Sequence, residues 1–108
     1  KSFVEVKNVT LFRNKDTAEF PDAVTARGTK HLLTLIDAIK KGYKSYLLFL
    51  VQIQNMEKFK IAKDVDGEYY NNYLTAKKAG VNFLAYRCNI STKKIFIDKK
   101  LKIIDAWF

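Results

Sequence analysis

Glu5 and Lys7 are separated by one residue within the apolar segment 3–7. Alternate side chains of a β-strand point to the same face, so this spacing predicts a carboxylate beside an amine, with Val4 and Val6 buried on the opposite face. A plain ion pair on a strand face is the simpler interpretation, because a three-residue pattern has many chance matches. The same pair is also the arrangement with which metal-dependent phosphodiesterases hold a cation and orient the attacking water.

Arg27 and His31 form a second group of this kind. They are four residues apart, which places them together at the edge of a helix face. A solvated helix face with a boundary histidine would explain the pair without any function. Thr10 and Gln52 are weaker candidates for polar contacts near such a site, and Gln52 follows a strand at the end where ligands bind in open α/β sheets.

Several other conspicuous residues have structural explanations. Asp22 follows a proline and precedes a helical pattern, which predicts a helix N-cap rather than a metal ligand. Tyr69, Tyr70 and Tyr73 have the spacing of a packing face, which favours core over base stacking. Cys88 has no His or Cys at ligand spacing, so we expect it to be a buried apolar residue.

The elements that would position these residues alternate between strand and helix. Residues 2–9 predict a first strand and residues 13–17 an exposed loop. Residues 23–41 predict a helix, in which Gly28 lies on the apolar face and indicates a close approach to the sheet. Residues 46–51 are uniformly apolar, which predicts a central strand buried on both faces and parallel to the first.

The second half continues the alternation. Residues 55–64 indicate an irregular basic connection, and residues 66–79 a second helix whose apolar side includes Leu74. Residues 81–88 predict a strand, residues 89–94 a turn, and residues 95–97 a last strand, so the two strands would form an antiparallel hairpin. The expected fold class is therefore α/β, a mixed sheet flanked by two helices.

Length and charge limit the functional classes. A chain of 108 residues holds at most one domain, and its net charge of +9 comes from 20 Lys and Arg against 11 Asp and Glu. A polyanion such as nucleic acid would explain the charge, and so would a lysine-rich composition. The chain has no apolar run long enough for a bilayer, which favours a cytoplasmic protein. Basic residues are densest near the C-terminus, where they are Arg87, Lys93, Lys94, Lys99, Lys100 and Lys102.

Two longer strings resemble the sugar fermentation stimulation protein A family: FVEVKNVTL at residues 3–11 and FPDAVTARGTKHL at residues 20–32. The pairs Gly80-Val81 and Ala85-Tyr86 also resemble it. The resemblance implies a PD-(D/E)XK nuclease-like fold, a restriction-endonuclease-like core that lacks its leading strands. On this basis residues 1–108 would be a single partial domain, the C-terminal part of a longer protein without its N-terminal barrel.

The resemblance also implies a function, a DNA-binding domain of nuclease fold with a metal-dependent phosphodiesterase site in the intact protein. Glu5 would ligate Mg²⁺ or Mn²⁺ together with an upstream Asp outside this chain, so no metal is expected in the fragment. Lys7 would position the water. Arg27 would contact a phosphate, and His31 would donate to it or assist proton transfer.

The alternative is a non-catalytic DNA-binding regulator of sugar utilisation genes. The oligomeric state is left open, with a dimer through an exposed sheet edge as one arrangement.

Overall fold

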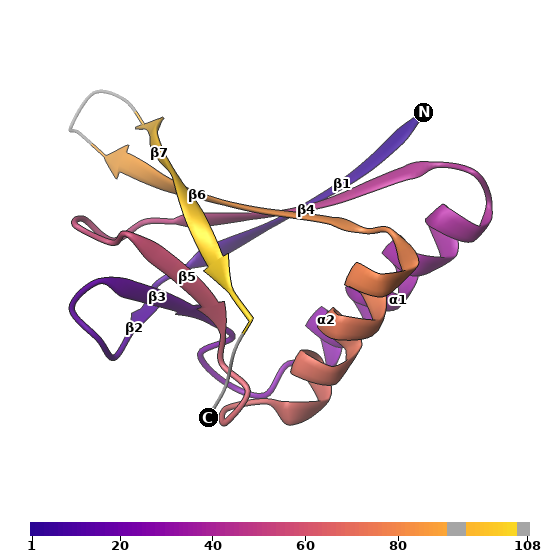
Figure 1. The fold of residues 1–108 in the computed structure, drawn as a ribbon, viewed down its shortest axis with the longest axis horizontal. Helices are drawn as coiled ribbons and strands as arrows, with labels where there is room; N and C mark the ends of the chain where they lie inside the picture. The colour runs from indigo at the N-terminus through magenta and orange to yellow at the C-terminus, as the bar shows by residue number, and fades with distance from the viewer. Residues whose placement is uncertain (91–94, 106–108) are drawn as a thin grey trace.

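The computed structural model describes residues 1–90 and 95–105. A mixed sheet and two helices make up this part of the chain (Figure 1). In chain order the elements are β1 (Ser2–Val9), β2 (Leu11–Phe12), β3 (Thr17–Phe20), α1 (Ala26–Lys40), β4 (Lys44–Val51), β5 (Lys58–Ile61), α2 (Gly67–Ala79), β6 (Asn82–Ile90) and β7 (Ile95–Ile104).

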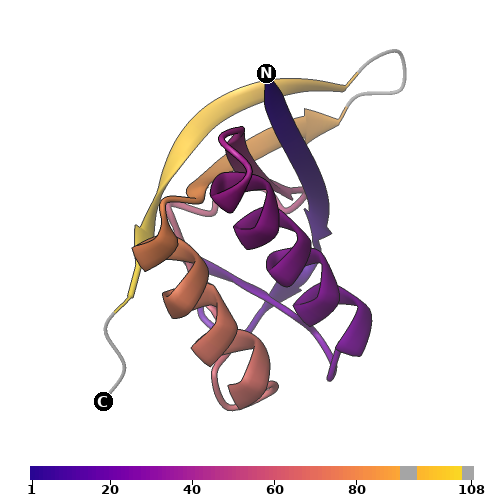
Figure 2. The same ribbon diagram turned by 90° about the vertical axis from the view of Figure 1, so that its right-hand side faces the viewer.

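The sheet has the strand order β1-β4-β6-β7-β5-β3-β2. β1 pairs in parallel with β4, and β4 in parallel with β6, whereas β6 and β7 form an antiparallel hairpin. The sheet curls, so that the β5–β3–β2 part folds back below β1, β4 and β6, and the two helices lie side by side against it (Figures 1 and 2). The predicted α/β class, mixed sheet and parallel β1–β4 pairing are therefore confirmed.

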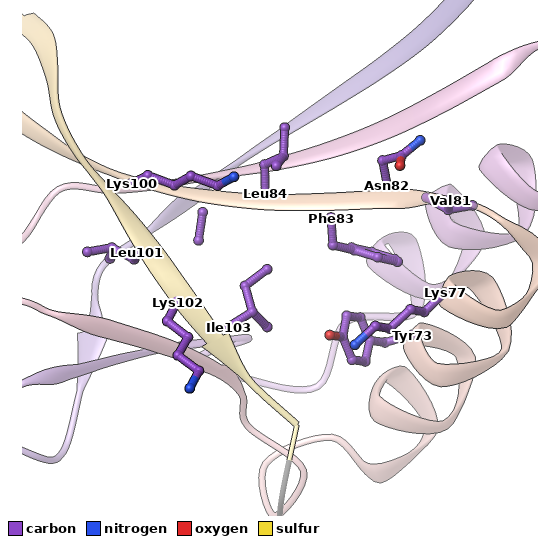
Figure 3. Close-up of a pocket in the computed structure, with 11 residues that line it drawn as sticks. Tyr73, Lys77, Val81, Asn82, Phe83, Leu84, Lys100, Leu101, Lys102 and Ile103 are labelled. Atoms are coloured by element: carbon purple, nitrogen blue, oxygen red, sulfur yellow. The ribbon is translucent and has the colours of Figure 1, made fainter.

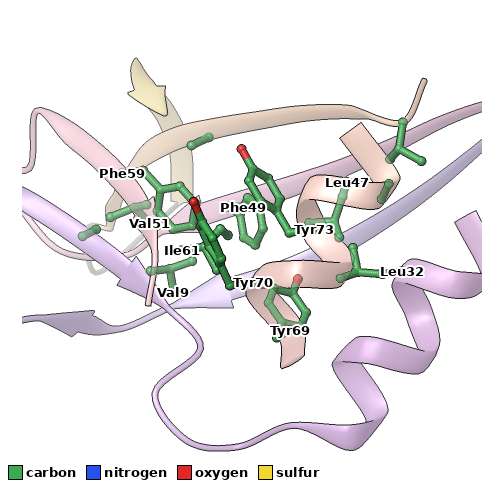
Figure 4. Close-up of a cluster of buried hydrophobic side chains, with 14 of the residues drawn as sticks. Val9, Leu32, Leu47, Phe49, Val51, Phe59, Ile61, Tyr69, Tyr70 and Tyr73 are labelled. Atoms are coloured by element: carbon green, nitrogen blue, oxygen red, sulfur yellow. The ribbon is translucent and has the colours of Figure 1, made fainter. Parts of the chain in front are cut away.

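The core lies between the helices and the inner face of the curled sheet (Figure 4). Aromatic rings make much of it: the rings of Phe49 and Phe59 lie 4.4 Å apart, and those of Tyr73 and Phe83 4.6 Å apart. The side chains that are fully buried include Val9, Leu32, Leu47, Phe49, Val51, Phe59, Ile61, Tyr69 and Tyr73. The predicted burial of Cys88 is also confirmed.

The prediction for the outer face of the sheet was wrong. Val4 is 60% exposed and Val6 48% exposed, because both helices pack against the opposite face and β1 is an edge strand. β4 is likewise buried on one face only, where Ser45, Leu47, Phe49 and Val51 point to the core; its other side chains are exposed or half-buried. The apolar run of residues 46–51 therefore marks a central strand, as predicted, but not one that is covered on both sides.

The helix α1 begins at Ala26, three residues later than predicted, and its N-cap is Thr25 rather than Asp22. The Thr25 hydroxyl accepts a hydrogen bond from the Gly28 amide at 2.9 Å, whereas Asp22 is exposed. The buried Asp66 carboxylate caps α2 at the Tyr69 amide and also accepts from the Thr25 amide at 2.9 Å. One carboxylate thus joins the first turns of both helices.

Other predictions fail where elements are short. Residues 55–64 contain β5, whose Phe59 and Ile61 alternate inward, and residues 11–12 and 17–20 form two further strands. Leu74 is 38% exposed instead of packing with the rest of α2. β7 extends to Ile104, and most of the predicted turn, residues 91–94, lies outside the described residues.

Gly28 does allow a close approach, but to α2 rather than to the sheet. A Cβ at this position would lie 3.1 Å from Cε1 of Tyr69 and 2.8 Å from Cγ2 of Thr25. The glycine therefore lets the two helices approach closely while Thr25 keeps its capping position.

Gly28→Ala is therefore expected to lower the free energy of unfolding by about 1–3 kcal/mol, because the methyl group must displace the Thr25 cap or the Tyr69 ring. The better helix propensity of alanine would offset only ~1 kcal/mol. The matched control is Gly67→Ala in the first turn of α2, where a Cβ would meet no atom within 4 Å. Urea denaturation measures both variants, and equal stabilities would contradict the proposed packing.

Candidate functional site

Glu5, Lys7 and His31 meet on the helix-facing side of β1. Lys7 Nζ donates a hydrogen bond to His31 Nδ1 at 2.5 Å. Glu5 Oε1 lies 3.5 Å from Lys7 Nζ and 3.2 Å from His31 Nδ1. The three side chains are half-buried, with Lys7 the least exposed at 15%. We call them the Glu5–Lys7–His31 cluster.

The topology explains why these residues meet. Parallel pairing places Glu5 level with Leu47 and Lys7 level with Phe49, two core residues of β4. Side chains that share a register position in a parallel sheet point to the same face, so the acid and the amine point toward α1. His31 follows Gly28 by one helical turn and meets them there.

The hydrogen bond between Lys7 and His31 determines what the imidazole can do. An Nδ1 atom that accepts from an ammonium carries no proton, so the proton of the neutral ring is on Nε2. The ring then keeps one N–H donor, and the Lys7 ammonium keeps N–H donors that His31 does not use. Together these groups are suited to binding an oxyanion, with a carboxylate beside them.

The structure does not bring the other predicted residues into this cluster. Arg27 is exposed and, within residues 1–90 and 95–105, forms no ion pair. Gln52 donates to the side chain of Asn8 at 2.8 Å, and Asn8 points away from the face that carries Lys7. Thr10 is exposed at the end of β1, with no side-chain hydrogen bond to the cluster.

Glu19 is a second buried carboxylate, but it already has a partner. It is only 2% exposed, and Arg13 binds it while also binding Asp64. These hydrogen bonds, first that of Asp64 and then that of Glu19, raise the pKa of Arg13. The group ties the β2–β3 hairpin to the loop after β5, which explains the buried charge structurally.

A separate pocket of about 430 Å³ lies between α2, β6 and β7 (Figure 3). Tyr73 and Phe83 contribute aromatic surface to it, and Lys77, Lys100 and Lys102 contribute ammonium groups. We call it the lysine-lined pocket. No sequence pattern singles out Lys77, because only the fold brings α2 beside β7.

The charge pattern of the lysine-lined pocket leaves two ammonium groups available. Lys77 pairs with Asp105, while Lys100 and Lys102 are exposed and form no ion pair with the rest of the described chain. Lys99, which the sequence grouped with them, pairs with Glu57. Lys93 and Lys94 of the same predicted basic cluster lie outside the described residues.

Metal binding by the described residues alone is not supported. No three His, Cys, Asp or Glu side chains in residues 1–90 and 95–105 gather as ligands for an ion. Glu5 is a single carboxylate whose neighbours are an amine and an imidazole, a donor set that does not complete a site for Mg²⁺ or Mn²⁺. Neither α1 nor α2, the helices of the described residues, is long and apolar enough to cross a bilayer.

Comparison with known proteins gives consistent matches. Residues 1–94 match the family described as sugar fermentation stimulation protein RE domain. A sugar fermentation stimulation protein homolog of Pelagibacter ubique is 76% identical over 106 residues, which cover 98% of this chain and 46% of that protein. A homolog of Syntrophotalea carbinolica is 46% identical over 103 residues, covering 95% and 45% respectively.

A solved structure matches as well. The structure of Pyrococcus furiosus SfsA in complex with Ca²⁺ superimposes with a TM-score of 0.88 at 28% sequence identity, covering 95% of this chain and 45% of that one. The chain thus spans about half the length of the proteins that it matches.

The tautomer of His31 tests the geometry of the cluster directly, because this is the only histidine in the chain. Long-range ¹H–¹⁵N NMR of the neutral ring is expected to show the proton on Nε2, since Lys7 donates to Nδ1. Lys7→Met should remove this preference, whereas Lys44→Met, an exposed residue, should leave it unchanged. A proton on Nδ1 in the wild-type protein would mean that the ring donates to Glu5 instead, which contradicts the arrangement.

Proposed function

The chain belongs to the sugar fermentation stimulation protein family, and from this membership we propose that it is a DNA-binding domain that contributes Glu5, Lys7 and His31 to a phosphodiesterase site. The observation that carries the proposal is the convergence of an acid, an amine and an imidazole on one half-buried face. All three residues lie in the part of the chain that matches the family, residues 1–94, and they come from two separate elements, β1 and α1.

The cluster suits a phosphodiester in chemical terms. The Lys7 ammonium would bind a non-bridging phosphate oxygen, or the water that attacks phosphorus. His31 would donate from Nε2 to the phosphate, or pass a proton during the reaction. Arg27, exposed on α1, would contact a neighbouring phosphate. The net charge of +9 favours a polyanionic partner. With DNA as that partner, the protein would act in the cytoplasm.

The described residues would supply only part of a divalent-cation site. The Pyrococcus furiosus SfsA structure is a complex with Ca²⁺, which supports cation binding in the family. Glu5 would be one ligand for Mg²⁺ or Mn²⁺, with a further carboxylate from outside the described residues. Such a cation, when bound, would stabilise the negative charge that develops on the phosphate.

The second candidate function is a non-catalytic DNA-binding regulator of sugar utilisation genes. The lysine-lined pocket favours it, because Lys100 and Lys102, which form no ion pair within residues 1–90 and 95–105, offer positive charge away from the cluster. In this alternative the Glu5–Lys7–His31 cluster is an ion pair that joins β1 to α1. Pairing of two copies through the exposed edge of β1 stays a prediction in either case.

The two candidates differ in the effect of Glu5→Gln on the full-length protein. We expect metal-dependent cleavage of DNA to fall at least ~100-fold, because the substitution removes a charged ligand without changing its shape. The matched control is Glu68→Gln on the exposed first turn of α2, which should cleave as the wild type does.

Cleavage that survives Glu5→Gln would rule out the assigned role. Salt-dependent DNA binding that ignores a chelator, with no cleavage by the wild type, would select the regulator instead.

The lysine-lined pocket gives a separate prediction about the salt dependence of DNA binding. Replacement of both Lys100 and Lys102 by alanine should reduce the slope of log K against log salt by about 1–2, because each phosphate contact releases a counterion. The control, Lys40→Ala with Lys44→Ala, removes the same charge from exposed positions elsewhere. Equal slopes for the two double variants would show that only net charge matters and that the pocket does not contact DNA.

A further inference from the structure

Tyr69 carries a buried hydroxyl group that the fold leaves unused. The side chain is 0% exposed, and its hydroxyl has no hydrogen-bond partner among the residues that the structure describes. The neighbouring tyrosines of α2 differ, since Tyr70 donates to the Asp105 carbonyl at 3.0 Å and Tyr73 to the Asp105 carboxylate at 2.6 Å. A buried hydroxyl without a partner lowers stability, so its presence needs an explanation.

The ring of Tyr69 lies against α1, the helix that carries His31. Tyr69 packs against the first turn of α1 at Gly28, whose Cβ would lie 3.1 Å from Cε1 of the ring. Gly28 and His31 are three residues apart and share a helix face. The Tyr69 ring also contacts Phe20 edge-on at 5.4 Å, and Figure 4 shows it on α2 beside Leu32 of α1.

The electrostatic surroundings keep the group a donor. Burial, then the negative charge of Glu5, then that of Asp66 raise the pKa of Tyr69. The phenol therefore stays protonated at neutral pH and is exposed to the field of the Glu5 carboxylate. A protonated donor close to a carboxylate is favourable when the carboxylate has no stronger partner.

The contacts of Glu5 suggest when that happens. In the free protein Glu5 Oε1 lies 3.5 Å from the Lys7 ammonium and 3.2 Å from Nδ1 of His31. Because this Nδ1 accepts from Lys7, the ammonium is the donor that Glu5 uses. A bound phosphate would compete with Glu5 for the Lys7 ammonium, because it carries negative charge itself. The carboxylate would then lose its partner in a half-buried position.

We propose that Tyr69 is a positioning residue, which hydrogen-bonds to the Glu5 carboxylate when a phosphate binds Lys7 and His31. Its hydroxyl donates to the freed carboxylate, which holds Glu5 in place and away from the phosphate oxygens. The inference rests on the proposed function, since it presupposes that an oxyanion binds at the cluster. In this proposal the Tyr69 hydroxyl has a hydrogen-bond partner only when phosphate is bound, and it does not stabilise the free protein.

Tyr69→Phe tests the proposal, because it removes the hydroxyl and keeps the ring. For a short DNA duplex in the presence of EDTA, we expect the affinity of the full-length protein to fall about tenfold, the usual effect of a hydrogen bond to a charged group. The melting temperature of the free protein should stay the same or rise. Tyr70→Phe is the matched control: it should lower the melting temperature and leave the affinity unchanged.

A double-mutant cycle with Glu5→Gln separates positioning from direct contact with the ligand. If Tyr69 acts through Glu5, Tyr69→Phe should have little further effect once Glu5 is replaced. An effect that persists in the Glu5→Gln background, an unchanged affinity, or a melting temperature that falls as in Tyr70→Phe would each overturn the inference.

The proposed function fails separately, if the wild-type protein does not bind the duplex at all. Inorganic phosphate then replaces the duplex as the probe, and the same comparison of Tyr69→Phe with the wild type decides the role of Tyr69. Weaker phosphate binding by the variant would support it, and equal or absent phosphate binding would overturn it.

Discussion

The contact between β1 and α1 through Lys7 and His31 is the interaction on which the site depends. It joins an edge strand, which has a neighbour on one side only, to the helix that covers the core. Half-buried charges lose hydration, and this cost is offset when they pair closely with one another. The cluster satisfies that condition, since one carboxylate, one ammonium and one imidazole approach within 3.5 Å. The same pairing leaves donors available for an oxyanion, so the structural role and the proposed binding role share the same atoms.

Helix packing decides whether this contact forms. Gly28 admits the Tyr69 ring, and Asp66 binds the first turns of both helices, so α1 is held by α2 as well as by the sheet. His31 lies one turn beyond Gly28 on α1, so the packing of the first turn also fixes the position of His31. The lysine-lined pocket is lined by residues of α2, β6 and β7, whereas the cluster lies between β1 and α1. Figure 2 shows α1 on the side of β1 and α2 on the side of β7. The domain therefore offers two separate candidate sites, one beside each helix.

Strong periodicity explains which parts of this fold can be predicted from sequence. The bounds of β1 and the bodies of α1 and α2 follow from regular apolar spacing, and their order implies the parallel pairing of β1 with β4. Short strands such as β5 carry too few residues to show a period. The exposure of Val4 and Val6 depends on what covers the outer face of the sheet, which local pattern does not encode. The capping role of Thr25 depends on Asp66, forty-one residues away.

The site divides in the same way. Strand alternation and a crossover helix are sufficient to bring Glu5 and Lys7 toward α1, and His31 lies on the face that they meet. Arg27 lies on the same helix but is exposed, and Gln52 hydrogen-bonds to Asn8. Whether each side chain reaches the cluster depends on a rotation of less than one turn, which the sequence spacing does not fix. The unsatisfied hydroxyl of Tyr69 has no sequence signal at all, since its spacing is that of an ordinary packing residue.

We propose that the phosphate backbone of DNA binds at the Glu5–Lys7–His31 cluster. A titration of labelled full-length protein with a short duplex, followed through the imidazole ¹⁵N resonances of His31, decides whether it does. If DNA binds there, these resonances shift and saturate together with binding. Resonances that stay unchanged at saturation, while amides of β7 respond, would instead place the DNA at the lysine-lined pocket alone.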